Sequence, residues 1–298
     1  RDQPRSRGLG DVYKRQYKDL DKYYTKDHIA DMCVDEMIKA LPHDVKDYLF
    51  IEPSAGSGSF IDAVKAKGLK IKGFDILPTR EDVIKNDFIN EDLNFLLSNE
   101  EQSQKKITIG NPPFGRKSAL AIDFVNKSLE QSDYVCFIIP NQFEKWSVQS
   151  KINPKAKLIA NIVLPEDSFI LVDKTIKLRC VFQIWTMKEG FEDLRIQTKP
   201  EINHPDFVMY QYNRTPEAEK YFDMEWDFAV PRQGYNDYTF KAYSKEECDM
   251  KKQWVFFKAS SKEVLDKLLS MDFVKLSKNN LGLPGFGKAD VVKEYKNM

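Results

Sequence analysis

The chain has 298 residues, 42% of them hydrophobic and 31% charged, which is enough apolar material for one large domain or for one domain plus a smaller module. Its longest apolar stretches, residues 135–140 and 158–165, are far shorter than the roughly 20 residues of a membrane-spanning helix, so they indicate buried strands. The formal net charge is zero, so evidence for a nucleic-acid partner has to come from local patches and from site chemistry.

Residues 1–16 show no apolar periodicity and no signal-peptide core, and they resemble translated sequencing-adapter read-through. We therefore exclude this segment from reasoning about the fold. The alternative is a disordered basic arm that contacts nucleic acid. Without the five basic and two acidic residues of the segment, 41 Lys and Arg residues face 44 Asp and Glu residues, a net charge of −3.

The four cysteines, Cys33, Cys136, Cys180 and Cys248, are widely scattered and form no CxxC pair. This pattern argues against a metal site. The thiols are best interpreted as small core residues in a reducing cytoplasm, the alternative being a disulfide between distant cysteines. We therefore expect a cytoplasmic protein that binds neither metal nor membrane.

Segments of helical and strand-like periodicity alternate between residues 17 and 190. Thr25 is the expected N-cap of an amphipathic helix that Pro42 ends. Further helices are expected at 59–67 and 119–129, and strands at 48–52, 69–75, 83–84, 107–110, 135–139, 158–164 and 180–187. Such alternation predicts an α/β fold, with a mostly parallel sheet covered by helices on both faces. Ligands of these sheets bind beyond the carboxyl ends of the strands.

The character of the chain changes after Met187. Residues 190–255 are rich in Tyr, Asp, Asn and Pro and have weak periodicity, whereas a strand at 254–257 and an amphipathic helix with Val264, Leu265, Leu268 and Leu269 follow. We therefore expect a boundary near residue 190, with a small substrate-recognition or accessory region at 191–298.

A glycine-rich turn, Ile51-Glu52-Pro53-Ser54-Ala55-Gly56-Ser57-Gly58-Ser59-Phe60, joins the first strand of the sheet to a helix. Gly56 and Gly58 would let the backbone pass close to a ligand, beside the free N–H groups of the helix. Glu52 suits an ammonium group, as in the methionyl part of S-adenosylmethionine. The turn lacks the spacing of a phosphate loop or of a dinucleotide fingerprint, and a purely structural turn is the alternative.

Acidic residues also end the next two strands. Asp75 lies about 20 residues beyond the glycine turn, where a carboxylate can accept both ribose hydroxyls of a nucleoside. In Asn86-Asp87-Phe88, Asp87 could accept from an adenine amine and Phe88 could stack on the ring. The alternatives are a solvated aspartate for Asp75 and an ordinary core aromatic for Phe88.

The most informative stretch is Gly110-Asn111-Pro112-Pro113-Phe114-Gly115. Two prolines directly after a buried strand fix an extended backbone, so the Asn111 amide oxygen and the Pro112 carbonyl oxygen can converge as acceptors. Phe114 offers a flat face beside them. This set suits an aromatic ring with an amino group, whose nitrogen becomes nucleophilic when two acceptors hold its hydrogens out of the ring plane. The alternative is a turn that merely contains Pro-Pro.

With these motifs the chain resembles the amino-group DNA methyltransferases, particularly the adenine-specific ones. EPSAGSGSF is similar to their cofactor motif, NPPF to their catalytic motif, Tyr23-Tyr24-Thr25 to the segment that completes the cofactor site, and Leu164–Phe169 with Arg179–Trp185 to late motifs. The order of the motifs resembles the gamma class, over about residues 17–190. The resemblance implies a Rossmann-like, seven-stranded S-adenosylmethionine methyltransferase fold.

The resemblance also implies roles for residues. The cofactor S-adenosylmethionine would be contacted by Tyr24, Thr25, Glu52, Pro53, Ser54, Gly56, Gly58, Phe60, Asp75, Ile76, Asp87 and Phe88. The catalytic group would be Asn111, Pro112, Pro113 and Phe114. The expected reaction is methyl transfer to the N6 amine of adenine in DNA.

Three other interpretations stay open. The same motif occurs in enzymes that methylate adenine in ribosomal RNA, and a related NPPY occurs in those that methylate a glutamine amide. The third interpretation is a non-catalytic subunit of a modification complex.

Basic and aromatic residues follow the catalytic motif and the fifth strand. Arg116 and Lys117 could contact phosphates, and Phe143 or Trp146 could stack on a base. The alternative is a solvated lysine-rich loop.

Overall fold

The computed structural model describes residues 23–171, 174–278 and 283–298, so the predicted read-through segment 1–16 lies outside the described residues. The chain divides into two compact units between Ile196 and Gln197. The assignment of a methyltransferase domain to residues 17–190 and of a recognition or accessory region to residues 191–298 stays a prediction.

A seven-stranded sheet with the order β4-β3-β2-β5-β6-β10-β7 forms the centre of the first unit. Adjacent strands are parallel from β4 to β6, whereas β10 pairs antiparallel with both β6 and β7. The expected α/β class with a mostly parallel sheet is thus confirmed. The strands are β2 (Leu49–Glu52), β3 (Lys70–Asp75), β4 (Val83–Lys85), β5 (Lys106–Gly110), β6 (Tyr134–Pro140), β7 (Lys157–Val163) and β10 (Cys180–Thr186).

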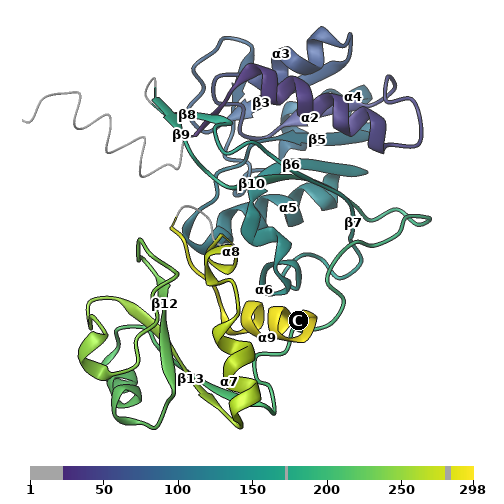
Figure 1. The fold of residues 1–298 in the computed structure, drawn as a ribbon. Coiled ribbons are helices and arrows are strands. Elements are labelled where there is room, and N and C mark those ends of the chain that lie inside the picture. The colour runs from purple at the N-terminus through teal and green to yellow at the C-terminus, as the bar shows by residue number, and fades with distance from the viewer. Residues whose placement is uncertain (1–22, 172–173, 279–282) are drawn as a thin grey trace, which may run out of the picture. The chain divides into compact units, whose positions relative to one another are not determined.

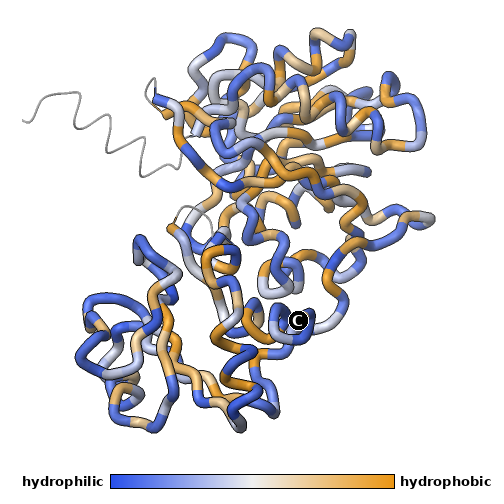
Figure 2. The backbone as a smooth tube through the Cα atoms, viewed as in Figure 1, coloured by the Kyte–Doolittle hydropathy of each residue, from blue (hydrophilic) through white to orange (hydrophobic). Residues whose placement is uncertain are grey.

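The central strands are buried along their whole length rather than at alternate residues. Every residue of β2, β5, β6 and β10 is buried, as expected for strands that are covered on both faces, and Figure 2 shows the sheet as a band of hydrophobic backbone. The chain order reverses at β2, because β3 and β4 lie on one side of it and β5 and β6 on the other. The carboxyl ends of β2 and β5 therefore form the switch point at which such sheets bind ligands.

Helices cover both faces of the sheet, with α2 and α3 on one side and α5 on the other (Figure 1). Helix α2 buries Ile29, Cys33 and Met37, which recur four residues apart on one face. The α-helices of this unit are α2 (Asp27–Ala40), α3 (Ser59–Ala66), α4 (Asn99–Ser103), α5 (Ala119–Gln131) and α6 (Trp146–Gln149), and the 3-10 turns are Leu93–Leu96, Arg116–Ser118 and Asn141–Glu144.

A second, small sheet of the first unit corrects the prediction for Thr25. Helix α2 begins at Asp27 with Lys26 as its N-cap, and no side chain caps it. Thr25 instead belongs to β1 (Tyr24–Thr25), which pairs antiparallel with β8 (Phe169–Leu171), and β8 pairs with β9 (Lys174–Ile176). A strand pairing with a segment more than 140 residues away along the chain outweighs the local capping preference.

The second unit contains a three-stranded antiparallel sheet with the order β11-β13-β12. Its core is aromatic, and Phe228 stacks on Phe257 with ring centroids 4.8 Å apart. The strand and the amphipathic helix expected after residue 253 are present as β13 and α7. The elements are β11 (Phe207–Tyr212), β12 (Phe228–Gln233), β13 (Gln253–Ala259), α7 (Lys262–Leu269), α8 (Phe273–Ser277) and α9 (Lys288–Asn297), with 3-10 turns at Pro216–Asp223 and Lys245–Glu247.

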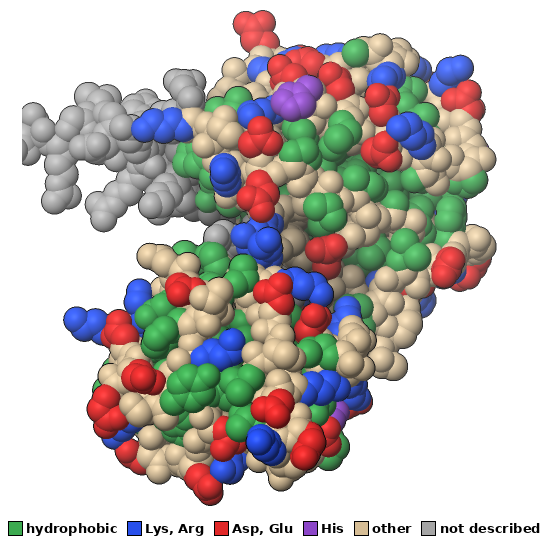
Figure 3. All heavy atoms as spheres, viewed as in Figure 1, with side chains coloured by type: hydrophobic (Ala, Val, Ile, Leu, Met, Phe, Trp, Pro, Cys, Tyr) green, Lys and Arg blue, Asp and Glu red, His purple; other side chains and the backbone are tan. Residues whose placement is uncertain are grey.

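The surface charges and the cysteines are distributed as follows in the described residues. Acidic and basic side chains are interspersed over the visible face of each unit (Figure 3). All four cysteines are buried free thiols. Within the described ranges, none of the helices has the length and apolar content that crossing a membrane requires, and no three His, Cys, Asp or Glu side chains group as metal ligands would.

Candidate functional site

A pocket of about 470 Å³ opens at the carboxyl ends of β2, β3, β4 and β5. Its volume is in the range of small-molecule sites. A smaller hollow of about 30 Å³ shares five of its lining residues. The predicted site residues that line the pocket are Tyr24, Pro53, Ser54, Gly56, Asp75, Ile76, Asp87, Phe88, Asn111, Pro113 and Arg116, and Thr25, Glu52 and Phe60 line the hollow.

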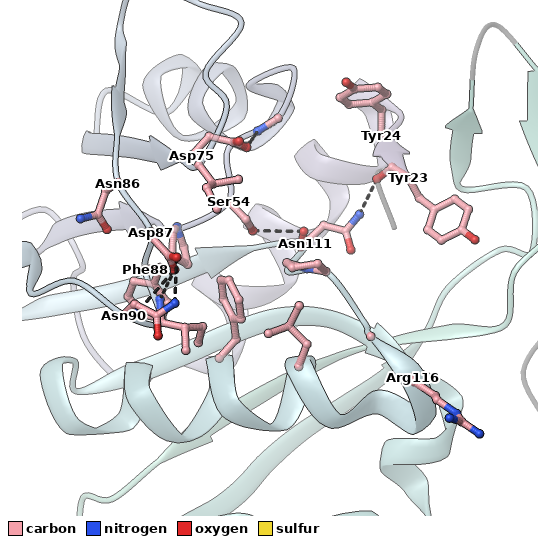
Figure 4. Close-up of a pocket in the computed structure, with 18 residues that line it drawn as sticks. Tyr23, Tyr24, Ser54, Asp75, Asn86, Asp87, Phe88, Asn90, Asn111 and Arg116 are labelled. Atoms are coloured by element: carbon pink, nitrogen blue, oxygen red, sulfur yellow. Dashed lines mark hydrogen bonds between the residues drawn. The ribbon is translucent and has the colours of Figure 1, made fainter. Parts of the chain in front are cut away.

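The glycine turn is closed by the carboxylate at the end of β3. The Gly56 N–H donates to Asp75 Oδ2 at 2.9 Å (Figure 4), and the Leu77 N–H donates to Asp75 Oδ1 at 2.8 Å. Asp75 is only 5% exposed, yet it lines the pocket. The turn and the strand end thus form one wall of the pocket.

Gly58 has a different role from the expected close approach to a ligand. It does not line either cavity, and a Cβ at this position would overlap the Arg80 guanidinium. Arg80 donates to both carboxylate oxygens of Asp62 on α3, at 2.7 and 3.0 Å, and to the Ser57 carbonyl at 3.2 Å. Gly58 therefore leaves room for a guanidinium that ties the turn to α3. Sequence reasoning missed Arg80, because no pattern around this residue indicates a contact with the glycine turn, 22 residues earlier in the chain.

We expect Gly58→Ala to lower the free energy of unfolding more than Gly190→Ala does. Both glycines have a φ of +87°, so the backbone strain of a side chain is matched, at about 1 kcal/mol. Only at Gly58 would the new Cβ also displace Arg80, because nothing lies within 4 Å at Gly190. Urea denaturation of the two variants measures the difference, and equal losses would contradict the Arg80 contact.

Glu52 is a buried carboxylate with an unpaired oxygen. It is 2% exposed, and its Oε2 has no hydrogen-bond partner. Burial, and secondly the neighbouring Asp75, raise the pKa of Glu52 well above its ordinary value. A Cβ on Gly110 would lie 3.2 Å from Glu52 Cγ, so the glycine before Asn111 gives this side chain its space. A cationic group bound in the hollow would supply the partner that Glu52 Oε2 lacks.

The loop after β4 presents an aromatic face and an amide. Asp87 accepts from the Ile89 and Asn90 N–H groups and from Asn90 Nδ2, and the Asn90 side chain is the main cause of its lowered pKa. Phe88 lines the pocket and packs on Phe124, with ring centroids 5.1 Å apart. Sequence reasoning did not assign a role to Asn86, whose Oδ1 is buried without a partner while Nδ2 donates to Glu91. Asn86 could have been predicted as a site residue, because it directly follows a parallel strand.

Asn111 has a fixed orientation. Its Nδ2 donates to the Tyr23 carbonyl at 2.9 Å (Figure 4) and to Thr25 Oγ1 at 3.1 Å, so both amide hydrogens have partners. Its Oδ1 is buried and accepts no hydrogen bond. The Asn111 carbonyl accepts from Ser54 Oγ at 3.3 Å, which connects the motif to the glycine turn. The side chain therefore offers the pocket an acceptor.

The other residues of the motif are more enclosed. Pro112 and Phe114 are buried and do not line the pocket, whereas Pro113 does. The Phe114 ring lies 6.2 Å from the Tyr23 ring, at an angle of 32°. In this state the Phe114 face is thus covered by protein.

The four predicted substrate contacts differ in exposure and in whether they line the pocket. Arg116 is exposed and lines the pocket, and its guanidinium extends away from the other labelled residues in Figure 4. Lys117 is exposed and Trp146 partly exposed, and neither lines the pocket. The prediction for Phe143 is wrong, because its ring is 0% exposed within the core cluster that contains Val148 and Ile152 and cannot stack on a base.

In comparisons with known proteins, no family model and no curated protein matches the chain. Among solved structures, a proposed RNA methyltransferase from Pyrococcus horikoshii is 16% identical, with a TM-score of 0.41 over 56% of this chain and 87% of that one. The methyltransferase subunit of a type I restriction-modification system from Streptococcus thermophilus is 14% identical, with a TM-score of 0.43 over 63% and 51%. A proposed class I S-adenosylmethionine-dependent methyltransferase from Listeria monocytogenes is 15% identical, with a TM-score of 0.42 over 59% and 63%. At this level of likeness, what the chain does has to be argued from its own residues.

Proposed function

We propose that this chain binds S-adenosylmethionine and transfers its methyl group to the N6 amine of adenine in DNA. The observation that carries the proposal is the asymmetric bonding of Asn111. Its two amide hydrogens are occupied by Tyr23 and Thr25, and its buried Oδ1 is left to accept. A buried acceptor without a partner is costly unless a ligand supplies the donor, and an exocyclic amine has two hydrogens to donate.

The donor set of the pocket fits S-adenosylmethionine. The unpaired Glu52 Oε2 is suited to the ammonium group, and Asp75 at the pocket wall is suited to ribose hydroxyls. Phe88 and Phe124 give the same pocket an apolar side for an adenine ring. When bound, this cofactor supplies an electrophilic methyl group on a sulfonium.

The protein has to make the amine nucleophilic and hold it in line. Asn111 Oδ1 accepts one amine hydrogen, and the Pro112 carbonyl is the proposed acceptor of the other, which favours a tetrahedral nitrogen with a free lone pair. The lone pair then forms the new N–C bond while the S–C bond breaks and its electron pair stays on sulfur. The extra proton leaves to water. No side chain has to act as a strong base, because the methylated ammonium is acidic.

The choice of DNA rests on the motif forms Phe114 and EPSAGSG, which favour adenine in DNA over ribosomal RNA or a glutamine amide. An adenine in duplex DNA has to flip out to reach such a pocket. Arg116, exposed at the pocket, is the cation that we assign to a phosphate beside the flipped nucleotide.

The test is methyl transfer from labelled S-adenosylmethionine to three substrates in parallel: methylation-free genomic DNA, total RNA and a protein extract. We expect label in DNA, recovered as N6-methyladenine after digestion, and its loss in Asn111→Ala. Label in RNA alone or in glutamine alone would overturn the DNA assignment. No label in any substrate, together with no binding of S-adenosylhomocysteine in calorimetry, would overturn the methyltransferase proposal.

A further inference from the structure

We propose that Thr25 is a positioning residue for the catalytic amide: its hydroxyl oxygen and the Tyr23 carbonyl together lock Asn111 with Oδ1 as the free acceptor. This inference rests on the proposed function and deepens it, because the resemblance assigns Thr25 to the cofactor alone. The contacts are the two hydrogen bonds from Asn111 Nδ2, at 2.9 and 3.1 Å.

The lock works because an amide has two nearly equivalent orientations, with oxygen and nitrogen exchanged. A carbonyl oxygen can only accept, so Tyr23 O discriminates against the flipped amide. The Thr25 hydroxyl could donate to a flipped Asn111 oxygen, but only one of the two contacts would then be satisfied. The pair of acceptors therefore favours the orientation in which Oδ1 of Asn111 is available to an amine.

Thr25 can act in this way because its own backbone is fixed from several sides. It pairs with Phe169 in the small sheet, the next residue donates its N–H to the Ser168 carbonyl at 3.1 Å, and Thr25 is only 7% exposed. The Thr25 carbonyl accepts from Ser59 Oγ at 2.9 Å, at the first residue of the helix after the glycine turn. The small sheet thus holds the Thr25 acceptor in place beside the Asn111 side chain, which neither strand β5 nor the glycine turn does alone.

The test compares Thr25→Val, which keeps the shape and removes the acceptor, with Thr25→Ser, which restores it. We expect kcat on methylation-free DNA to fall about tenfold in Thr25→Val, the effect of one lost hydrogen bond, and to return to within about twofold of the wild type in Thr25→Ser. The dissociation constant of S-adenosylhomocysteine, measured by calorimetry, should change less than about threefold. Thr175→Val, an exposed position on β9 of the same sheet, is the matched control and should behave as the wild type.

A second measurement does not depend on the reaction. In NMR spectra of the ligand-free protein, the Asn111 side-chain amide, assigned by its absence in Asn111→Ala, should exchange with solvent about tenfold more slowly than that of the exposed Asn213, and Thr25→Val should remove most of this protection. Equal exchange in the wild type and Thr25→Val would overturn the lock, and so would a loss of kcat matched by an equal loss of cofactor affinity. If the wild type transfers no methyl group at all, the proposed function fails, and the exchange data still decide the lock.

Discussion

Asn111→Ala should lower kcat for methyl transfer by about 100- to 1,000-fold, the range seen when one preorganised polar contact to a developing charge is removed. Alanine deletes the buried Oδ1, the acceptor that the protein leaves unpaired. The affinity for S-adenosylhomocysteine should stay close to that of the wild type, because the contacts assigned to the cofactor lie on Glu52, Asp75 and Phe88. Single-turnover kinetics and calorimetry separate the two effects.

Two variants make this prediction specific. Asn111→Asp keeps an acceptor oxygen but loses the amide donor to Tyr23 and Thr25, so its activity should lie between those of the wild type and alanine variants. Asn213→Ala changes an exposed asparagine of the second unit and should leave kcat unchanged. More than a tenth of wild-type activity in a folded Asn111→Ala protein would contradict the catalytic role of the amide oxygen.

Periodicity located the central sheet well, because its strands are short apolar runs between clear breaks. The expected strand at residues 48–52 is Leu49–Glu52, and the one at 135–139 is Tyr134–Pro140. The second unit was harder. Its strands β11 and β12 pair with β13 across long sequence separations, as Phe207 does with Ala259, and Pro231 interrupts the pattern of β12. Local patterns do not contain such pairings.

The site residues, like the strands, were easier to predict where local sequence determines their position. Asp75 and Asn111 were predicted as site residues because they end strands of the sheet, and both line the pocket; their roles stay predictions. Residues whose role depends on a distant partner were misread: Thr25 was expected as a helix cap, and Phe143 as a stacking surface. Phe143 follows a strand as Asn111 does, and its burial depends on neighbours such as Val148 and Ile152, so exposure could not be deduced from position alone.

Glu52→Gln should stabilise the ligand-free protein and weaken cofactor binding. Burial penalises the ionised carboxylate and raises its pKa, which costs about 1.4 kcal/mol for each pKa unit. Glutamine removes this charge, so the free energy of unfolding at pH 8 should rise by about 1 kcal/mol or more. The same change removes the partner proposed for the ammonium group, so the dissociation constant of S-adenosylhomocysteine should rise on the order of 100-fold.

The stability change caused by Glu52→Gln should depend on pH. Because the pKa of Glu52 is higher in the folded protein than in the unfolded chain, the folded state holds the proton more tightly, and the stability it contributes is lost as pH rises between the two pKa values. The stabilisation by Glu52→Gln should therefore be absent below about pH 4, near the unfolded pKa, and grow with pH. Glu217→Gln, at an exposed position, should show no such trend. A carboxylate kept only for folding would lose stability on substitution, so a gain in stability joined to a loss of binding identifies Glu52 as a ligand-binding group.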